Sequence, residues 1–203
     1  MKKIVLIAAL AFVAGVGVAG IFAVRGFVVE SASAQAEPSE ADSEALQAKV
    51  NAIKLGEKAG EGRQPARVEV SESELESYVM FALRERIPAR VDSIAVRLTP
   101  GSVAADTKLT FESNPTKNPM IDVLISGTHR FFLKGQLSAA DGQGKCVLEE
   151  ARVDGIPVPV VFIETLLEKY VKPRYPQVKL DQAFTMPWGI EALTITEGKA
   201  TVD

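Results

Sequence analysis

The sequence is poor in the residues that build metal centres and catalytic relays. It contains a single cysteine, Cys146, and a single histidine, His129, in 203 residues. One cysteine cannot form an internal disulfide, and so few thiols and imidazoles exclude the common cysteine- and histidine-rich metal sites. The short motifs of serine hydrolases, P-loop proteins and zinc proteases are missing too. We therefore expect no enzyme activity, no metal and no other cofactor.

Positive charge and aromatic side chains are also scarce. The formal net charge is -3, and only 6% of the residues are aromatic. Nucleic-acid binding requires a basic surface, and single-stranded nucleic acids stack on aromatic rings, so we exclude nucleic acid as a partner. The hydrophobic content of 47% is usual for a folded domain.

The longest apolar run lies near the N-terminus, where residues 4–24 follow two lysines. A helix of about 21 residues spans roughly 30 Å, the thickness of a bilayer core. We predict a membrane anchor at residues 1–25, in the inner membrane, with the C-terminal domain in the periplasm or extracytoplasmic space. The small residues around Ala34 and Ala36 also suit a signal peptidase, so a cleaved signal segment and a secreted protein stay open as the alternative.

Residues 26–66 have the composition of a flexible linker. The stretch 31–43 is small, acidic and interrupted by proline, so it cannot bury enough apolar area to fold alone. A short amphipathic helix is plausible at 43–55, before a glycine-rich break. We expect the folded envelope domain to occupy residues 67–203. The apolar positions that share one face of the short helix are Leu46, Val50 and Ile53.

The domain begins with a strand at 68–70 and an amphipathic helix. Ser71 followed by Glu74 is a capping box, and the helix should end at Arg86, before Pro88. Its apolar stripe comprises Leu75, Tyr78, Val79, Ala82 and Leu83.

The middle of the chain alternates between apolar and polar residues, which predicts antiparallel strands with one dry and one wet face. The longest alternation, 121–137, has Gly127, Phe131 and Gly135 on its dry face, where glycines suit bends. Further strands are expected at the C-terminal end of the chain. The fold class is therefore α+β: a curved antiparallel β-meander of about five or six strands with two helices packed on its concave side. The other predicted strands of the middle part are 93–98, 103–111 and 146–153, the last after a hairpin loop at 141–144.

The second helix is predicted between Pro159 and Pro173. One of its flanks suits the sheet, whereas Val161, Phe162 and Leu166 form a second apolar flank that needs another cover.

Isolated polar residues receive structural interpretations. His129 lies on the inward row and is expected to be a half-buried, hydrogen-bonded residue, and Cys146 to be a small core residue. Glu149 and Glu150 are adjacent in a strand, so they should point to opposite faces and not form an acid pair.

Three motifs together resemble the tubular lipid-binding superfamily, most closely its small membrane-anchored members of the bacterial envelope. They are V-E-V-S-E-S-E-L (68–75), D-G-I-P-V-P-V-V-F-I (154–163) and M-P-W-G-I-E-A-L-T-I-T-E-G-K (186–199). The resemblance implies a long helix over a strongly curved sheet, with an acyl-chain groove between them.

Two functions follow as hypotheses. The first is a non-catalytic, membrane-tethered domain that binds lipid or another hydrophobic ligand between helix and sheet. The alternative is an anchored assembly module that docks another envelope protein through an apolar patch around Phe132 and Leu124. The residues expected to line the groove of the first hypothesis are Ile125, Phe131, Val161, Phe162 and Leu166.

Overall fold

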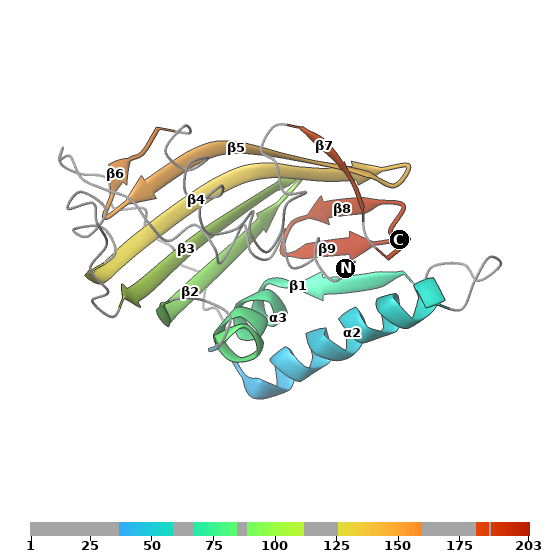
Figure 1. Cartoon of the computed structure of the whole chain (residues 1–203), viewed down its shortest axis with the longest axis horizontal. Coiled ribbons are helices and arrows are strands. Elements are labelled where there is room, and N and C mark those ends of the chain that lie inside the picture. Colours follow the sequence, from blue (N-terminus) through green and yellow to red (C-terminus); the bar gives the residue numbers. More distant parts are fainter. Residues whose placement is uncertain (1–36, 59–66, 85–88, 112–125, 160–181, 187) are drawn as a thin grey trace.

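The computed structural model describes residues 37–58, 67–84, 89–111, 126–159, 182–186 and 188–203. Within these ranges the chain forms two α-helices, one π-helical turn and a nine-stranded sheet (Figure 1). The helical elements are α2 (Glu40–Lys58), α3 (Glu72–Ser77) and the π-helix η1 (Tyr78–Ala82). The strands are β1 (Val68–Ser71), β2 (Arg90–Thr99), β3 (Ser102–Phe111), β4 (Gly127–Ala140), β5 (Gln143–Val153), β6 (Ile156–Pro157), β7 (Ala183–Thr185), β8 (Leu193–Thr196) and β9 (Lys199–Val202).

The sheet is antiparallel and curls into a half-barrel (Figure 1). Its main path runs β1-β9-β8-β4-β3-β2, and β5 lies on the other side of β4, where it also pairs with β6 and β7. Strand β8 joins β4 at Ala139, beyond the point where β3 begins. The predicted α+β class with a curved antiparallel sheet is confirmed. The sheet has more strands than predicted, and the shortest of them, β6 and β7, have only two and three residues, too few for an alternating pattern to be recognised.

The predicted alternation is present in the strands that form the body of the sheet. Cross-strand registers place Ile94, Thr107, Phe131 and Val153 side by side on the inner face. Strand β4 continues to Ala140, past the predicted end, whereas the predicted beginning at 121–125 lies outside the described residues. The buried inner-face positions of β3 are Val103, Ala105, Thr107, Leu109 and Phe111.

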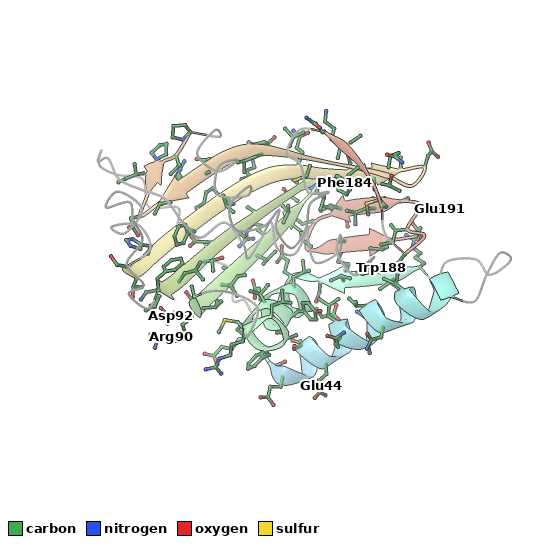
Figure 2. The ribbon with its side chains drawn as sticks, viewed as in Figure 1. Glu44, Arg90, Asp92, Phe184, Trp188 and Glu191 are labelled. Atoms are coloured by element: carbon green, nitrogen blue, oxygen red, sulfur yellow. The ribbon has the colours of Figure 1, made fainter. Side chains whose placement is uncertain are left out.

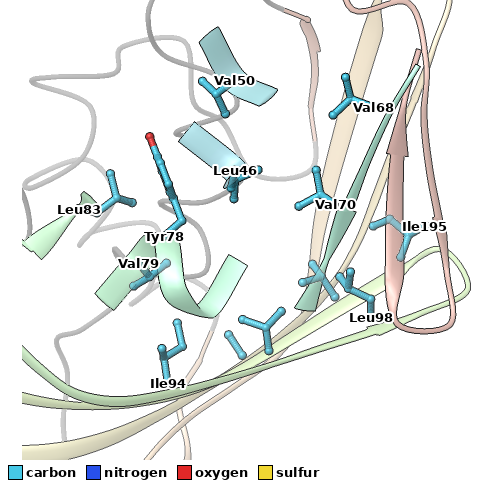
Figure 3. Packing of buried hydrophobic residues seen from close by; sticks show 13 residues of the cluster. Leu46, Val50, Val68, Val70, Tyr78, Val79, Leu83, Ile94, Leu98 and Ile195 are labelled. Carbon is cyan, nitrogen blue, oxygen red and sulfur yellow. The ribbon is translucent and has the colours of Figure 1, made fainter. Parts of the chain in front are cut away.

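Helix α2 belongs to the folded core, which corrects its assignment to a linker. It has 19 residues, and Leu46 and Val50 are each only 1% exposed, while Glu44 points away from the sheet (Figure 2). Lys49 donates hydrogen bonds to the Glu69 carbonyl of β1 (2.7 Å) and the Glu74 carboxylate of α3 (2.5 Å). The apolar face predicted for a short helix is therefore the face that α2 buries in the core (Figure 3).

Helix α3 joins the two end strands of the main path. It follows β1 directly, and its Ser71 capping box is present as predicted. Its glutamates reach β2: Glu76 accepts a hydrogen bond from the Val96 N–H at 2.7 Å, and Glu72 accepts one from the Leu98 N–H at 2.6 Å. The helix continues as the π-helix η1, and not as the α-helix predicted to Arg86. Carboxylates of α3 thus occupy the free hydrogen-bonding edge of β2.

Two predicted elements lie outside the described residues. These are the membrane anchor at 1–25 and the second helix between Pro159 and Pro173. Neither α2 nor α3, the α-helices of the described ranges, combines the length and hydrophobicity that a transmembrane span requires. The two helices of the described fold are therefore α2 and α3, the first of which had been predicted as part of the linker.

Candidate functional site

The candidate site is the inner face of the half-barrel around Phe131. This residue is 3% exposed and lies on β4 between Thr107 of β3 and Val153 of β5. It is the one predicted groove residue within the described ranges. The other four predicted residues, Ile125, Val161, Phe162 and Leu166, lie outside the described residues.

Two aromatic contacts position Phe131. Its ring meets Phe111 edge-on, with centroids 6.2 Å apart and an interplanar angle of 77°. The His129 imidazole makes a similar contact at 6.3 Å and 68°. Edge-to-face pairs at these distances are favourable because the positive ring edge faces the negative π-face. The ring of Phe131 is thus fixed from its own strand and from β3.

The inner face has two parts. The first, which we call the helix-covered cluster, packs against α2, α3 and η1, and Figure 3 shows its central residues. The second lies further along β3, β4 and β5, and we call it the Phe131 wall. Both parts consist of buried apolar side chains. The sheet residues of the helix-covered cluster are Val68, Val70, Ile94, Val96, Leu98, Val103, Ala105 and Ile195, and its other members are Leu46, Val50, Tyr78, Val79 and Leu83. The Phe131 wall comprises Leu109, Phe111, Phe131, Leu133, Ala151 and Val153.

Thr107 lies where the two parts meet. It is 3% exposed, and its hydroxyl has no hydrogen-bond partner within the described part of the chain. Burying a hydroxyl without a partner costs about 1–3 kcal/mol. In the predicted strand 103–111, Thr107 is one polar side chain among apolar ones at alternate positions. This is the signal in the sequence that could have pointed to it.

A polar pair lies at the end of the Phe131 wall. His129 Nδ1 is 2.7 Å from the Asp154 carboxylate, and Nε2 is 3.2 Å from the Ser126 carbonyl oxygen. Both partners are acceptors, so both contacts are hydrogen bonds when each ring nitrogen carries a proton. Asp154 also accepts from the Arg130 N–H at 2.8 Å. The predicted half-buried, hydrogen-bonded histidine is confirmed, with 16% of its side chain exposed.

The outer face of the sheet is a network of charged cross-strand pairs. Arg130 binds the Asp106 carboxylate through two nitrogens, at 2.7 and 2.6 Å, and this pairing raises the pKa of the arginine. Phe132, predicted to belong to an apolar docking patch, is half-buried, and the Arg152 guanidinium carbon lies 5.6 Å from its ring centroid. Leu124, the other residue of that patch, lies outside the described residues. Near the start of β2, Arg90 and Asp92 pair at 2.8 Å (Figure 2).

The prediction that Glu149 and Glu150 point to opposite faces is wrong. The register of β4 and β5 shifts at this point, so that Lys134 pairs with Glu150 and the next β4 residue pairs with Leu148. An extra residue in one strand interrupts the alternation of faces. Glu149 therefore contacts Gln136 and Lys134, at 2.6 and 3.4 Å, on the outer face. Glu150 contacts Arg152, so each glutamate has a cationic partner of its own.

The described ranges contain no group of three or more histidine, cysteine, aspartate or glutamate side chains that could hold a metal ion. Comparisons with protein-family models, curated proteins and solved structures found no match. The two parts of the inner face and the Thr107 hydroxyl are therefore the features from which a function can be inferred.

Proposed function

We propose that this protein is a non-catalytic, membrane-tethered domain of the bacterial envelope that binds lipid or another hydrophobic ligand on the inner face of its half-barrel. The Phe131 wall carries the proposal. It is a continuous group of buried apolar side chains on three adjacent strands, and it continues beyond the helix-covered cluster. Burial of an acyl chain on such a surface contributes about 0.8 kcal/mol for each methylene group.

The proposed geometry agrees with the groove that the resemblance to tubular lipid-binding proteins implies. A strongly curved sheet can surround an acyl chain on several sides, whereas a flat sheet covers only one. In this proposal Phe131 contacts the chain from the sheet, and Val161, Phe162 and Leu166 contact it from the opposite side. His129 and Asp154 would then lie at the polar end of the ligand, because they are polar and more exposed than the Phe131 wall.

The proposed location follows from the apolar run at residues 4–24. A helical anchor there, preceded by two lysines, leaves the half-barrel outside the inner membrane. Ser39 of the first described segment donates its N–H to the Ser77 hydroxyl of α3 at 3.0 Å. The chain therefore enters the folded domain beside α3, which in this proposal is the end closest to the membrane.

Native mass spectrometry tests the proposal directly. The protein without residues 1–36 is purified from bacterial cells and measured before and after incubation with phospholipid vesicles. We expect an added mass that corresponds to one lipid and that persists after mild desalting. A protein that carries no lipid from the cells and takes up none from vesicles would refute lipid binding.

The alternative is an anchored assembly module that docks another envelope protein through Phe132. It has less support, because Arg152 lies over this ring and charged pairs surround it on the outer face. A photocrosslinking residue at position 132, in membranes, would trap a protein partner under this alternative. The variant Phe132→Asp should then remove the partner while its thermal unfolding remains cooperative. Crosslinks to lipid alone, or none, would refute the assembly module.

A further inference from the structure

The Thr107 hydroxyl is surrounded on its face of the sheet by apolar neighbours. In a sheet, the neighbours of a side chain on the same face are its two cross-strand partners and the residues two positions away along its own strand. For Thr107 the cross-strand partners are Ile94 and Phe131, and the strand neighbours are Ala105 and Leu109. All four are 2–7% exposed. None of these side chains offers a hydrogen-bond acceptor or donor to the hydroxyl.

An enclosed water molecule is a poor partner for this hydroxyl. A buried water usually makes about three hydrogen bonds and needs two to four polar partners. The four nearest inner-face neighbours of Thr107 provide none, and the diagonal neighbour His129 has its two ring nitrogens at Asp154 and Ser126. A partner for the hydroxyl therefore has to approach from above the inner face of the sheet. It has to be a mostly apolar group that carries one hydrogen-bond acceptor.

We propose that Thr107 donates a hydrogen bond to an ester carbonyl of the bound lipid, and that the ligand of the half-barrel is therefore an ester-linked acyl lipid. This inference rests on the proposed lipid-binding function. An ester carbonyl accepts a hydrogen bond and is continuous with an acyl chain, which matches one hydroxyl within an apolar wall. The headgroup lies toward His129, and the acyl chain extends from Thr107 past Phe131 toward Leu133, away from that polar end. The carbonyl offsets the cost of burying the hydroxyl, which an unbranched hydrocarbon cannot do.

A competition between two phospholipids tests the contact. The full chain, purified in detergent, is incubated with equal amounts of two phosphatidylglycerols that have the same chain length, one ester-linked and one ether-linked. After gel filtration the retained lipids are extracted, and their ratio is measured by mass spectrometry. We expect the wild-type protein to prefer the ester lipid about two- to tenfold, the ratio that one net neutral hydrogen bond supplies.

The variant Thr107→Val keeps the branched shape and removes the hydroxyl. It should retain both lipids in equal amounts, and without lipid it should melt about 2–4 °C higher than the wild type, because an unpartnered buried hydroxyl is removed. The matched control is Thr194→Val on β8, an exposed position that should keep the wild-type ratio.

The outcomes separate the two proposals. A full chain that retains neither lipid would overturn the proposed lipid-binding function, and this inference with it. Retention of both lipids in equal amounts by the wild type would overturn the ester contact alone. A lower melting temperature for the lipid-free Thr107→Val protein would also overturn the ester contact, because it would mean that the hydroxyl has a partner within the protein.

Discussion

The two parts of the inner face differ in how they accommodate buried polar groups. Beside the helix-covered cluster, Glu76 of α3 is 2% exposed, and its carboxylate accepts a hydrogen bond from a backbone N–H of β2. On the boundary of the Phe131 wall, Thr107 is buried to a similar degree, and its hydroxyl has no partner within the described ranges. Stable interiors satisfy nearly all of their buried polar groups. The first part therefore satisfies its buried carboxylate, whereas the second leaves one buried hydroxyl without a partner in the described ranges, and the proposed lipid contact rests on this difference.

We expect the helix-covered cluster to stabilise the fold, and the Phe131 wall, under the proposed function, to bind the ligand as well. Side chains of the helix-covered cluster contact several elements of the same chain, so their loss should reduce stability alone. Side chains of the Phe131 wall should affect both stability and ligand choice. Three substitutions test this separation.

The largest loss of stability is expected for Leu46→Ala in α2. Leu46 is 1% exposed in the helix-covered cluster, so its truncation leaves a cavity and should cost about 2–5 kcal/mol of unfolding free energy. Urea denaturation followed by circular dichroism measures the change, and lipid retention should stay at the wild-type level. The control Glu44→Ala removes an exposed side chain of the same helix and should have little effect. A loss of less than about 1 kcal/mol of unfolding free energy for Leu46→Ala would mean that α2 is part of the linker and not of the folded core.

A smaller loss, accompanied by a change in ligand choice, is expected for Phe131→Ala. In a sealed core this truncation costs about 3–5 kcal/mol. If a lipid lies against the ring, the lipid fills part of the space, and the cost in the lipid-bound protein should be below about 3 kcal/mol. Native mass spectrometry with a mixture of chain lengths should show a shift toward longer or bulkier chains.

The adjacent residue provides the control for Phe131→Ala. Phe132→Ala changes the same side chain on the same strand, but on the outer face under Arg152. It should cost only about 0.5–1 kcal/mol, the usual size of an exposed cation–π contact, with no change in chain-length preference. If Phe131→Ala and Phe132→Ala shifted the preference for lipid chain length equally, the inner and outer faces would not differ in ligand binding.

The smallest effect is expected for Glu76→Gln, and its pH dependence is the test. Burial, with repulsion from Glu72, raises the pKa of Glu76 above its usual 4.5, although the Val96 N–H and Arg97 act in the opposite direction. The folded state therefore binds this proton more tightly than the unfolded state does. The Glu76 carboxyl therefore contributes its full stabilisation of the folded state below pH 4.5, and this contribution is lost as the pH rises through the folded-state pKa.

Glutamine keeps an oxygen for the Val96 N–H and does not ionise. The stability of Glu76→Gln relative to the wild type should therefore increase from pH 4 to pH 8, as measured by thermal unfolding across that range. The exposed Glu44→Gln should show no such trend. A relative stability that falls with increasing pH would mean that the ionised carboxylate is favoured in the fold.

The strand pattern could be predicted from the sequence, because alternation reports directly which face a side chain occupies. This worked for the predicted strand 103–111, where every second residue from Val103 to Phe111 is buried in β3. It failed at Glu149 because a bulge changes the register without a signal in the local composition. Alternation also placed Thr107 on the inner face, but it could not show that all of its neighbours on that face are apolar, since this depends on the pairing of three strands.

The helices were harder to predict for a different reason. The Leu46 and Val50 spacing was recognised, but the acidic, proline-containing stretch before it indicated a linker, and only tertiary contacts show that this face is buried. Glu72 and Glu76 carry no sequence signal for burial, because glutamates on a helix usually face water. Their partners on β2 are 20 positions away for Glu76 and 26 for Glu72, and only the fold brings them together.

The contacts of α2 and α3 with the end strands also affect how the protein behaves at high concentration. An end strand with free N–H and C=O groups is a template on which another chain can add a strand, which leads to aggregation. Here the N–H groups of Val96 and Leu98 are bonded to carboxylates, and the Glu69 carbonyl of β1 is bonded to the Lys49 ammonium. Acidic side chains thus cover donors at one end of the main strand path, and a basic side chain covers an acceptor at the other. These two ends of the main path can therefore remain unpaired and still resist the addition of a strand from another copy of the chain.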